Sequence, residues 1–419
     1  MTRGLCGLAL LLAALAATAC GGSGGASKDG VRRVVIYSSF PLQGASRPQA
    51  VAMNNGAKLA LSQAGGRVGS FAVEFTPLDD SVAQSGNWDP GQTSADARKA
   101  AIDQRAVAYL GEYNSGATAI SLPLTNQADL PQITVSSSVG LTQDGPGTAP
   151  GEPDKYYPSG TRTLVRVAAT DNVQGQVLAE LPVQDGCRNA AVVDDQEVFG
   201  KGLADVVVAA AKRSGLRIVS TQGIDKQAAN YRSLAAGLAA RGTSCFVFTG
   251  CTANGAVQLF KDVAHALPSA RLYGSDCVLT EDFYDPRHGG LPDSVARRVH
   301  ITAQVLPPDQ YGPQGRKVFA DYSKAYGVAH PASYAIYGYE MMELALTALR
   351  NASKTVGKDA SIAEIRHATV KALYRIRNYD GALGTYGVTP TGDITLANLA
   401  VYGIKDAAPV FLRKVPVQS

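Results

Sequence analysis

Short apolar runs that resemble β-strands alternate with helix-like segments along most of this chain of 419 residues. The runs are continuous and rich in β-branched residues, as in Val34–Tyr37, Ala106–Leu110 and Cys245–Phe248. Between them, apolar residues recur at helical spacing, for example over residues 52–64 and 199–214. Continuous apolar strands indicate burial on both faces, which is typical of a parallel sheet covered by helices on both sides. The pattern therefore predicts an α/β fold.

The strand–helix rhythm runs through twice, which predicts two doubly wound parallel-sheet lobes. Three helices are expected within residues 315–375, and one of them begins with a capping box made by Ser361 and Glu364. These helices return to complete the first lobe, so the chain crosses between the lobes three times and forms a multi-crossing hinge. The predicted boundaries are residues 31–166 with 305–385 for lobe 1, and residues 167–304 with 386–419 for lobe 2.

The first 20 residues predict export. Arg3 precedes an apolar run that is too short to span a bilayer, and the run ends in small residues followed by Cys20. This arrangement resembles the bacterial lipoprotein signal, which implies a signal peptide over residues 1–19 and lipidation of Cys20. Residues 20–30 would then be the lipid anchor and a flexible Gly/Ser tether on the outer face of the cytoplasmic membrane. Ordinary secretion with cleavage near Ala19 is the alternative.

Composition and charge exclude several classes of partner. Hydrophobic residues make up 45% of the chain and charged residues 18%, as in a soluble globular protein. The basic residues are scattered, so the formal net charge of +4 does not indicate nucleic-acid binding. No later apolar stretch reaches the roughly 18–20 residues that a membrane span needs.

Four cysteines remain once Cys6 and Cys20 are set aside. In an exported chain they suggest two disulfides, for which sequence alone allows three pairings. No two of them have the close spacing of a zinc knuckle, so no metal site is expected. In a doubly wound sheet the strands near residues 190–193 and 245–248 lie side by side. This strand order predicts the pairs Cys187–Cys245, before the strands, and Cys251–Cys277, after them.

The sequence carries no recognisable catalytic motif. It lacks a phosphate-binding GxxxxGK[ST] loop, a GxGxxG turn, a GxSxG elbow and an HExxH pair. The five histidines are isolated in sequence. We therefore expect neither an enzyme nor a bound cofactor.

Small hydroxyl residues and glycines instead gather where predicted strands end. Ligands of doubly wound sheets bind beyond these carboxyl ends. Ser115 and Gly116 also open a helix, whose N–H groups and dipole favour an anion such as a carboxylate. Helix capping by serine is the alternative reading of each position. The positions are Ser38–Ser39, Asn114–Gly116, Ser136–Ser138, Gly250–Thr252 and Gly274–Asp276.

Several short motifs resemble the branched-chain amino-acid (Leu/Ile/Val) binding protein family. The most specific is Val192–Asp195 with Phe199–Ala204, and the others are Phe40–Gly44, Leu110–Gly111 with Ser115, Leu130–Pro131, Leu141–Thr142 and Gln174–Gly175. This resemblance implies a type I periplasmic binding fold and a lipoprotein that delivers solutes to the permease of an ABC importer. The alternative is a receptor of the same fold that signals to a membrane partner.

The resemblance also implies a ligand site. Ser115 would hold a ligand carboxylate, Ser136 and Ser138 would contact the ammonium and carboxylate, and Asp276 would pair with the ammonium. Phe199 would line the pocket from the second lobe. Asp276 is shorter than the family's glutamate, which predicts an amino acid or related small zwitterion not restricted to the branched-chain ones. Polar Asn114 in the lining segment points the same way, and Thr252 and Tyr334 are placed nearby.

Overall fold

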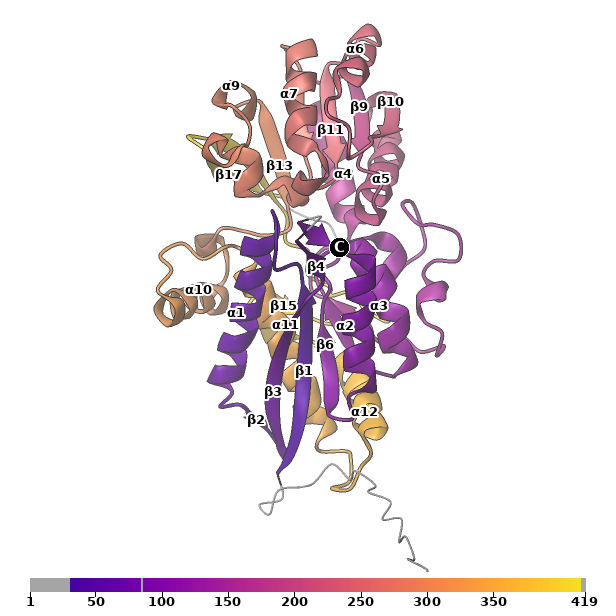
Figure 1. Cartoon of the computed structure of the whole chain (residues 1–419), viewed down its shortest axis with the longest axis vertical. Helices are drawn as coiled ribbons and strands as arrows, with labels where there is room; N and C mark the ends of the chain where they lie inside the picture. The colour runs from indigo at the N-terminus through magenta and orange to yellow at the C-terminus, as the bar shows by residue number, and fades with distance from the viewer. Residues whose placement is uncertain (1–30, 84–85, 416–419) are drawn as a thin grey trace, which may run out of the picture.

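The computed structural model describes residues 31–83 and 86–415. Two lobes lie one above the other in Figure 1, each built on its own sheet. The predicted fold class, two lobes with mainly parallel sheets, is confirmed. The predicted signal peptide, Cys20 and tether lie outside the described residues. Within the part described, no helix combines the length and the apolar character needed to cross a membrane.

The first sheet has the strand order β2-β3-β1-β6-β7-β8. Its central strand β1 (Arg32–Phe40) pairs in parallel with β3 and with β6, and the apolar side chains of Val34 and Ile36 are fully buried. A short β2 runs antiparallel at the edge. The other strands are β2 (Arg67–Val68), β3 (Phe71–Asp79), β6 (Ala106–Leu110), β7 (Gln132–Thr134) and β8 (Leu164–Arg166), with the hairpin β4 (Ser81–Val82) and β5 (Asn87–Trp88) beside them.

Six helices accompany this sheet. Two of them, α1 and α11, pack so closely that a Cβ on Gly338 would lie 1.9 Å from the carbonyl oxygen of Met53. The predicted capping box of Ser361 and Glu364 begins α12. The helices are α1 (Arg47–Gln63), α2 (Pro90–Ile102), α3 (Ser115–Gln127), α10 (Pro313–Tyr326), α11 (Ala335–Ala352) and α12 (Ile362–Tyr374). The last three are the predicted returning helices.

The second sheet has the order β10-β9-β11-β12-β13-β16-β17, in which the pairings β13–β16 and β16–β17 are antiparallel and the other pairings are parallel. Its strands are β9 (Asn189–Asp194), β10 (Arg217–Gly223), β11 (Cys245–Thr249), β12 (Arg271–Gly274), β13 (Val299–Ala303), β16 (Ala400–Lys405) and β17 (Ala408–Lys414). Its helices are α4 (Asp171–Gln184), α5 (Val198–Ser214), α6 (Arg232–Ala240), α7 (Ala256–Ala266) and the short α8 (Glu281–Tyr284) and α9 (Asp293–Ala296). The tail strands thus join the second sheet.

Within the described residues the chain passes between the sheets three times, after β8, after β13 and after the small hairpin of β14 (Tyr379–Gly381) and β15 (Gly384–Tyr386). Arg166, the last residue of β8, is fully buried at these crossings. Its guanidinium pairs with the carboxylate of Asp393, on the third crossing segment, at 2.6 Å. The ion pair therefore joins the first and third crossings. The exact lobe boundaries stay predictions.

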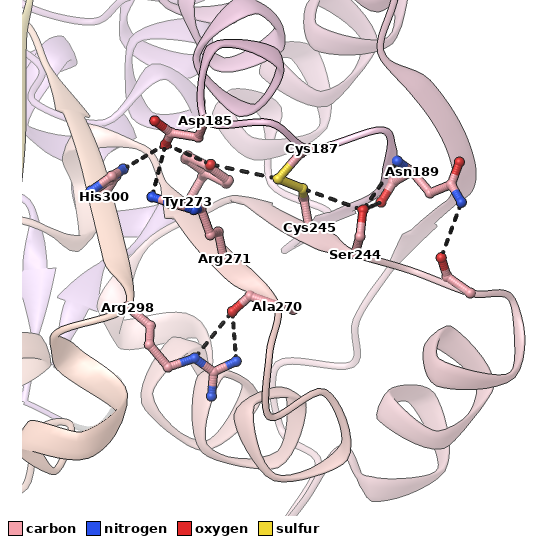
Figure 2. The surroundings of a disulfide bond; sticks show 11 residues. Asp185, Cys187, Asn189, Ser244, Cys245, Ala270, Arg271, Tyr273, Arg298 and His300 are labelled. Atoms are coloured by element: carbon pink, nitrogen blue, oxygen red, sulfur yellow. Dashed lines mark hydrogen bonds and ion pairs between the residues drawn. A yellow bond between two sulfur atoms is a disulfide. The ribbon is translucent and has the colours of Figure 1, made fainter.

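Both disulfides have the predicted pairing. Strands β9 and β11 are neighbours, and Cys187 and Cys245 lie at their amino-terminal ends with Cα atoms 6.1 Å apart. Figure 2 shows the polar groups around this bond, where the Tyr273 hydroxyl donates to Asp185 at 2.8 Å. Cys251 and Cys277 follow the adjacent strands β11 and β12, at the opposite edge of the sheet, with Cα atoms 4.6 Å apart.

Candidate functional site

A cavity of about 30 Å³ lies between the lobes, beyond the carboxyl ends of the strands. The first lobe contributes loops after β6 and β7 and the residue before α11. The second lobe contributes the start of α5 and the loops after β11 and β12. The lining residues are Tyr113, Asn114, Ser115, Val135, Ser137, Phe199, Cys251, Asp276, Cys277 and Tyr334. Five of the eight residues predicted to bind ligand are therefore brought together here: Asn114, Ser115, Phe199, Asp276 and Tyr334.

Asp276 supplies the acidic group of this cavity. Its Oδ1 accepts a hydrogen bond from Gln174 Nε2 and its Oδ2 accepts one from the Tyr334 hydroxyl, each at 2.9 Å. Burial raises the pKa of Asp276, although these two donors oppose that shift. No lysine or arginine of the described residues forms an ion pair with this carboxylate. It is thus a partly buried anion in need of a cation.

Two tyrosines form the first-lobe wall opposite Asp276. The rings of Tyr113 and Tyr334 meet edge to face with centroids 5.4 Å apart. Burial raises the pKa of Tyr113 to a value above its ordinary range, so its hydroxyl stays protonated. Sequence reasoning missed Tyr113, although it directly precedes the predicted Asn114 and Ser115.

The serines divide between the cavity and the wall behind it. Ser115 begins α3, and its Oγ accepts a hydrogen bond from the backbone N–H of Ser138 at 3.3 Å. Ser138 Oγ is buried without a hydrogen-bond partner, and so is Asn114 Oδ1. Ser136 turns away, because its hydroxyl donates to the carbonyl of Glu112 at 3.0 Å. Ser137, which the sequence placed at this strand end without a ligand role of its own, lines the cavity in its place.

The second-lobe wall is held by a buried carboxylate. Asp195 accepts hydrogen bonds from the backbone N–H of Cys251 at 3.0 Å and from Asn254 Nδ2 at 2.7 Å. It thereby ties the loop after β11 to the segment before α5, which carries Phe199. Thr252 does not reach the cavity, because its hydroxyl shares a 2.8 Å hydrogen bond with that of Thr280. The Cys251–Cys277 disulfide closes this wall.

A second carboxylate, Asp171, lies close behind the site and was missed by sequence reasoning. It is fully buried at the first turn of α4, and neither of its carboxylate oxygens has a hydrogen-bond partner. Burial raises the pKa of Asp171 to about 7; the negative charge of Asp276 adds to the shift, and the nearby hydroxyls of Ser137 and Ser138 oppose it. Its backbone N–H donates to the Ser137 carbonyl at 2.9 Å. The signal in the sequence was its position: Asp171 is an acidic residue at the start of α4, the helix that follows the crossing after β8.

Arg166 holds the loop of Ser136, Ser137 and Ser138 through hydrogen bonds to its backbone. Its Nη1 donates to the carbonyls of Ser136 and Ser138 at 3.2 and 2.7 Å. The buried cation thereby fixes the backbone that carries the lining residue Ser137. In the described residues, no group of three or more histidine, cysteine, aspartate or glutamate side chains could hold a metal ion.

The arrangement suits a small ligand with a cationic group, held between two hinged lobes. A family model described as periplasmic binding protein matches residues 38–408. The chain belongs to the periplasmic binding protein family. Members of this family bind solutes and are not enzymes, as the sequence predicted.

Relatives of this binding protein span most of its length. An amino acid binding protein of Pseudomonas aeruginosa is 23% identical over 78% of this chain and 81% of its own. A Leu/Ile/Val-binding protein homologue of Brucella abortus is 22% identical over 88% of this chain and 90% of its own. The crystal structure of a leucine-binding protein from Thermotoga maritima matches with a TM-score of 0.75 at 17% identity, covering 91% of this chain and 98% of that one. The structural match shows the shared fold.

Proposed function

We propose that this chain is the extracytoplasmic substrate-binding lipoprotein of an ABC importer, and that it binds an amino acid or related small zwitterion between its lobes. The observation that carries the proposal is Asp276, an acidic side chain without an ion-pair partner among the described residues, in a cavity lined by both lobes. An ammonium group would neutralise it through charge-assisted hydrogen bonds worth about 1.5–3 kcal/mol each. The names of the two relatives agree with such a ligand.

The opposite end of the ligand would face the start of α3. The N–H groups of its first turn and the Ser115 hydroxyl are suited to a carboxylate. Ser138 does not line the cavity, so it would act from behind, through its backbone N–H on the Ser115 hydroxyl. Phe199 would cover the ligand from the second lobe. Ser136 and Thr252 would act from behind the wall, because their hydroxyls already have partners there.

Closure would follow from contacts on both sides. A ligand that touches Ser115 in the first lobe and Asp276 in the second gains both sets of contacts only when the lobes are together. It therefore shifts the population toward the closed form. The lipid at Cys20 would keep the receptor on the outer face of the cytoplasmic membrane, beside the permease that takes over the ligand.

The test is calorimetry of the full-length chain, purified in detergent, with a panel of L-amino acids. We expect Asp276→Asn to lower affinity at least about tenfold, or about 1.4 kcal/mol, because the ammonium loses its charged partner. The matched control is Asp282→Asn, which changes an exposed aspartate of the same lobe and should leave affinity unchanged. Equal affinity of the Asp276 variant and the unsubstituted chain would reject the assignment. Uptake of the labelled ligand by cells with and without the chain separates import from signalling.

A further inference from the structure

A second and much larger cavity, of about 710 Å³, opens beside the cleft. It lies between α3 and the segment 147–156 of the first lobe and the start of α5 in the second. Apolar groups dominate its walls: Trp88, Ile120, Pro150, Tyr156 and Val198. Val198 is among the few large apolar side chains of the described residues that are well exposed, at 40%. Exposed apolar surface gathered in a concavity is typical of a ligand site.

The two cavities lie next to each other in both lobes. Ser115 lines the small cavity and its neighbour Gly116 lines the large one, and Phe199 and Val198 divide in the same way. Trp88, the single tryptophan of the chain, lies against this junction. A Cβ on Gly116 would come within 2.6 Å of its ring, so the glycine makes room for the indole.

The small cavity is too small for a whole amino acid. At about 30 Å³ it has room for about two water molecules, which suits the charged head of a zwitterion but not a long side chain. The remainder of a ligand anchored at Asp276 must lie outside the small cavity, and the large cavity is bounded by Gly116 and Val198, the sequence neighbours of the lining residues Ser115 and Phe199.

The charged groups at the rim of the large cavity are already paired. Lys155 contacts Glu152 at 3.0 Å, Lys201 contacts Asp205 at 3.5 Å, and Lys226 pairs with Glu197. A charged ligand group would have to compete with these pairs, whereas an uncharged group needs only the apolar walls. At the rim of this cavity the two lobes approach each other closely at Gly147 and Gly202. A Cβ on Gly147 would lie 2.5 Å from the carbonyl oxygen of Gly202.

We propose that the large cavity receives an uncharged, apolar tail of the ligand, and that the preferred ligand is an amphipathic amino compound longer than leucine. The inference rests on the proposed function, because it takes the ammonium at Asp276 as the anchor. Trp88 and Val198 are then specificity-determining residues, one from each lobe. The β4–β5 hairpin, which carries Trp88, would thereby help to select ligands by the length of their apolar tail.

The test measures chain-length dependence by calorimetry on the full-length chain in detergent. The probes are straight-chain L-α-amino acids, from alanine to 2-aminooctanoate. Each methylene buried in an apolar site is expected to raise affinity about fourfold, so affinity should climb through the longer members. Val198→Trp places an indole in the large cavity at its junction with the small one and should lower the affinity for 2-aminooctanoate at least about tenfold, while binding of alanine is kept.

Val410→Trp is the matched control, because Val410 is equally exposed, at 40%, but lies on β17 away from the cavity. An affinity that peaks at short chains, or a Val198→Trp variant that binds the long probe as the unsubstituted chain does, would overturn the inference. In that case short probes would still bind in an Asp276-dependent way, and the proposed function would stand. Absence of binding by every probe would remove both proposals together.

Discussion

The hydroxyl of Tyr334 donates a 2.9 Å hydrogen bond to Oδ2 of Asp276, so a side chain beside α11 in the first lobe directly contacts the acidic residue of the second. The same carboxylate is bonded to Gln174 of its own lobe. Asp276 is thus one place where the two lobes share a polar contact, so its protonation state should affect the contact between the lobes as well as the proposed ligand.

Binding of an amino acid should weaken in acid, and the phenol of Tyr334 should set where this begins. Burial raises the pKa of Asp276, and the Tyr334 donor opposes that rise by stabilising the ionised form. As pH falls through this raised pKa, the carboxyl becomes neutral and no longer pairs with an ammonium. Tyr334→Phe removes the donor, so affinity should fall from a higher pH onward, as measured by calorimetry across a pH series. The control Tyr337→Phe removes a hydroxyl bonded to the Gln304 carbonyl instead. An equal pH shift in both variants would contradict the assignment.

The two disulfides should differ in what their removal changes. In the loop-entropy model, Cys187–Cys245 contributes about 4 kcal/mol and Cys251–Cys277 about 3.5 kcal/mol to the free energy of unfolding, from separations of 58 and 26 residues. Only the second bond lines the ligand cavity. Double serine variants of each pair should therefore both unfold at lower urea concentration, but only the variant of Cys251 and Cys277 should also lose ligand affinity. Equal affinity in the two variants would show that the bond is purely structural.

The buried ion pair at the hinge should matter far more than an exposed one. Burial alone would raise the pKa of Asp393, but the charge of Arg166 and hydrogen bonds hold it below its usual range. Asp393→Asn leaves a buried guanidinium without its charge partner, which should cost about 3–5 kcal/mol in urea unfolding. The matched change Glu74→Gln breaks a half-exposed pair with Arg105 and should cost less than about 1 kcal/mol. Similar losses in both variants would refute the hinge role.

The close packing of α1 against α11 depends on glycine. In Gly338→Ala the new methyl would lie 1.9 Å from a backbone oxygen of α1, so the helices must separate. We expect a loss of about 1–3 kcal/mol in the free energy of unfolding, from chemical denaturation. Gly237→Ala, within α6, meets only the flexible guanidinium of Arg241 at 3.2 Å, and should gain up to about 1 kcal/mol from its higher helix propensity. A neutral Gly338 variant would mean that the helix pair adjusts without cost.

The fold could be predicted because the apolar strand runs, the helix-capping residues and the strand order all indicate the same architecture. Buried strands such as β11 are continuous apolar runs, and α12 begins at the Ser361–Glu364 capping box. The disulfide pairing followed from strand adjacency alone. Strand ends also located Ser115 and Asp276, because parallel strands bring their carboxyl ends to one side of the sheet.

The remaining site residues depend on loop conformation, which sequence patterns do not determine. Ser136 and Ser137 are chemically equivalent neighbours, and only the backbone path after β7 turns the first toward Glu112 and the second toward the cavity. Tyr113 was missed for the same reason. Asp171 reaches the site through a lobe crossing, so its nearness to Ser137 depends on how the lobes sit rather than on any local pattern.

The contact between Gly147 and Gly202 joins the lobes at a place where Gly147 faces the Gly202 carbonyl oxygen and the Val206 side chain. The two backbones can approach this closely because neither glycine carries a side chain. A Cβ at Gly147 would lie 2.5 Å from the Gly202 carbonyl oxygen, so a larger residue there would hold the two lobes apart at this contact. Under the proposed function, this pair of glycines therefore lets the two lobes come together over a bound solute.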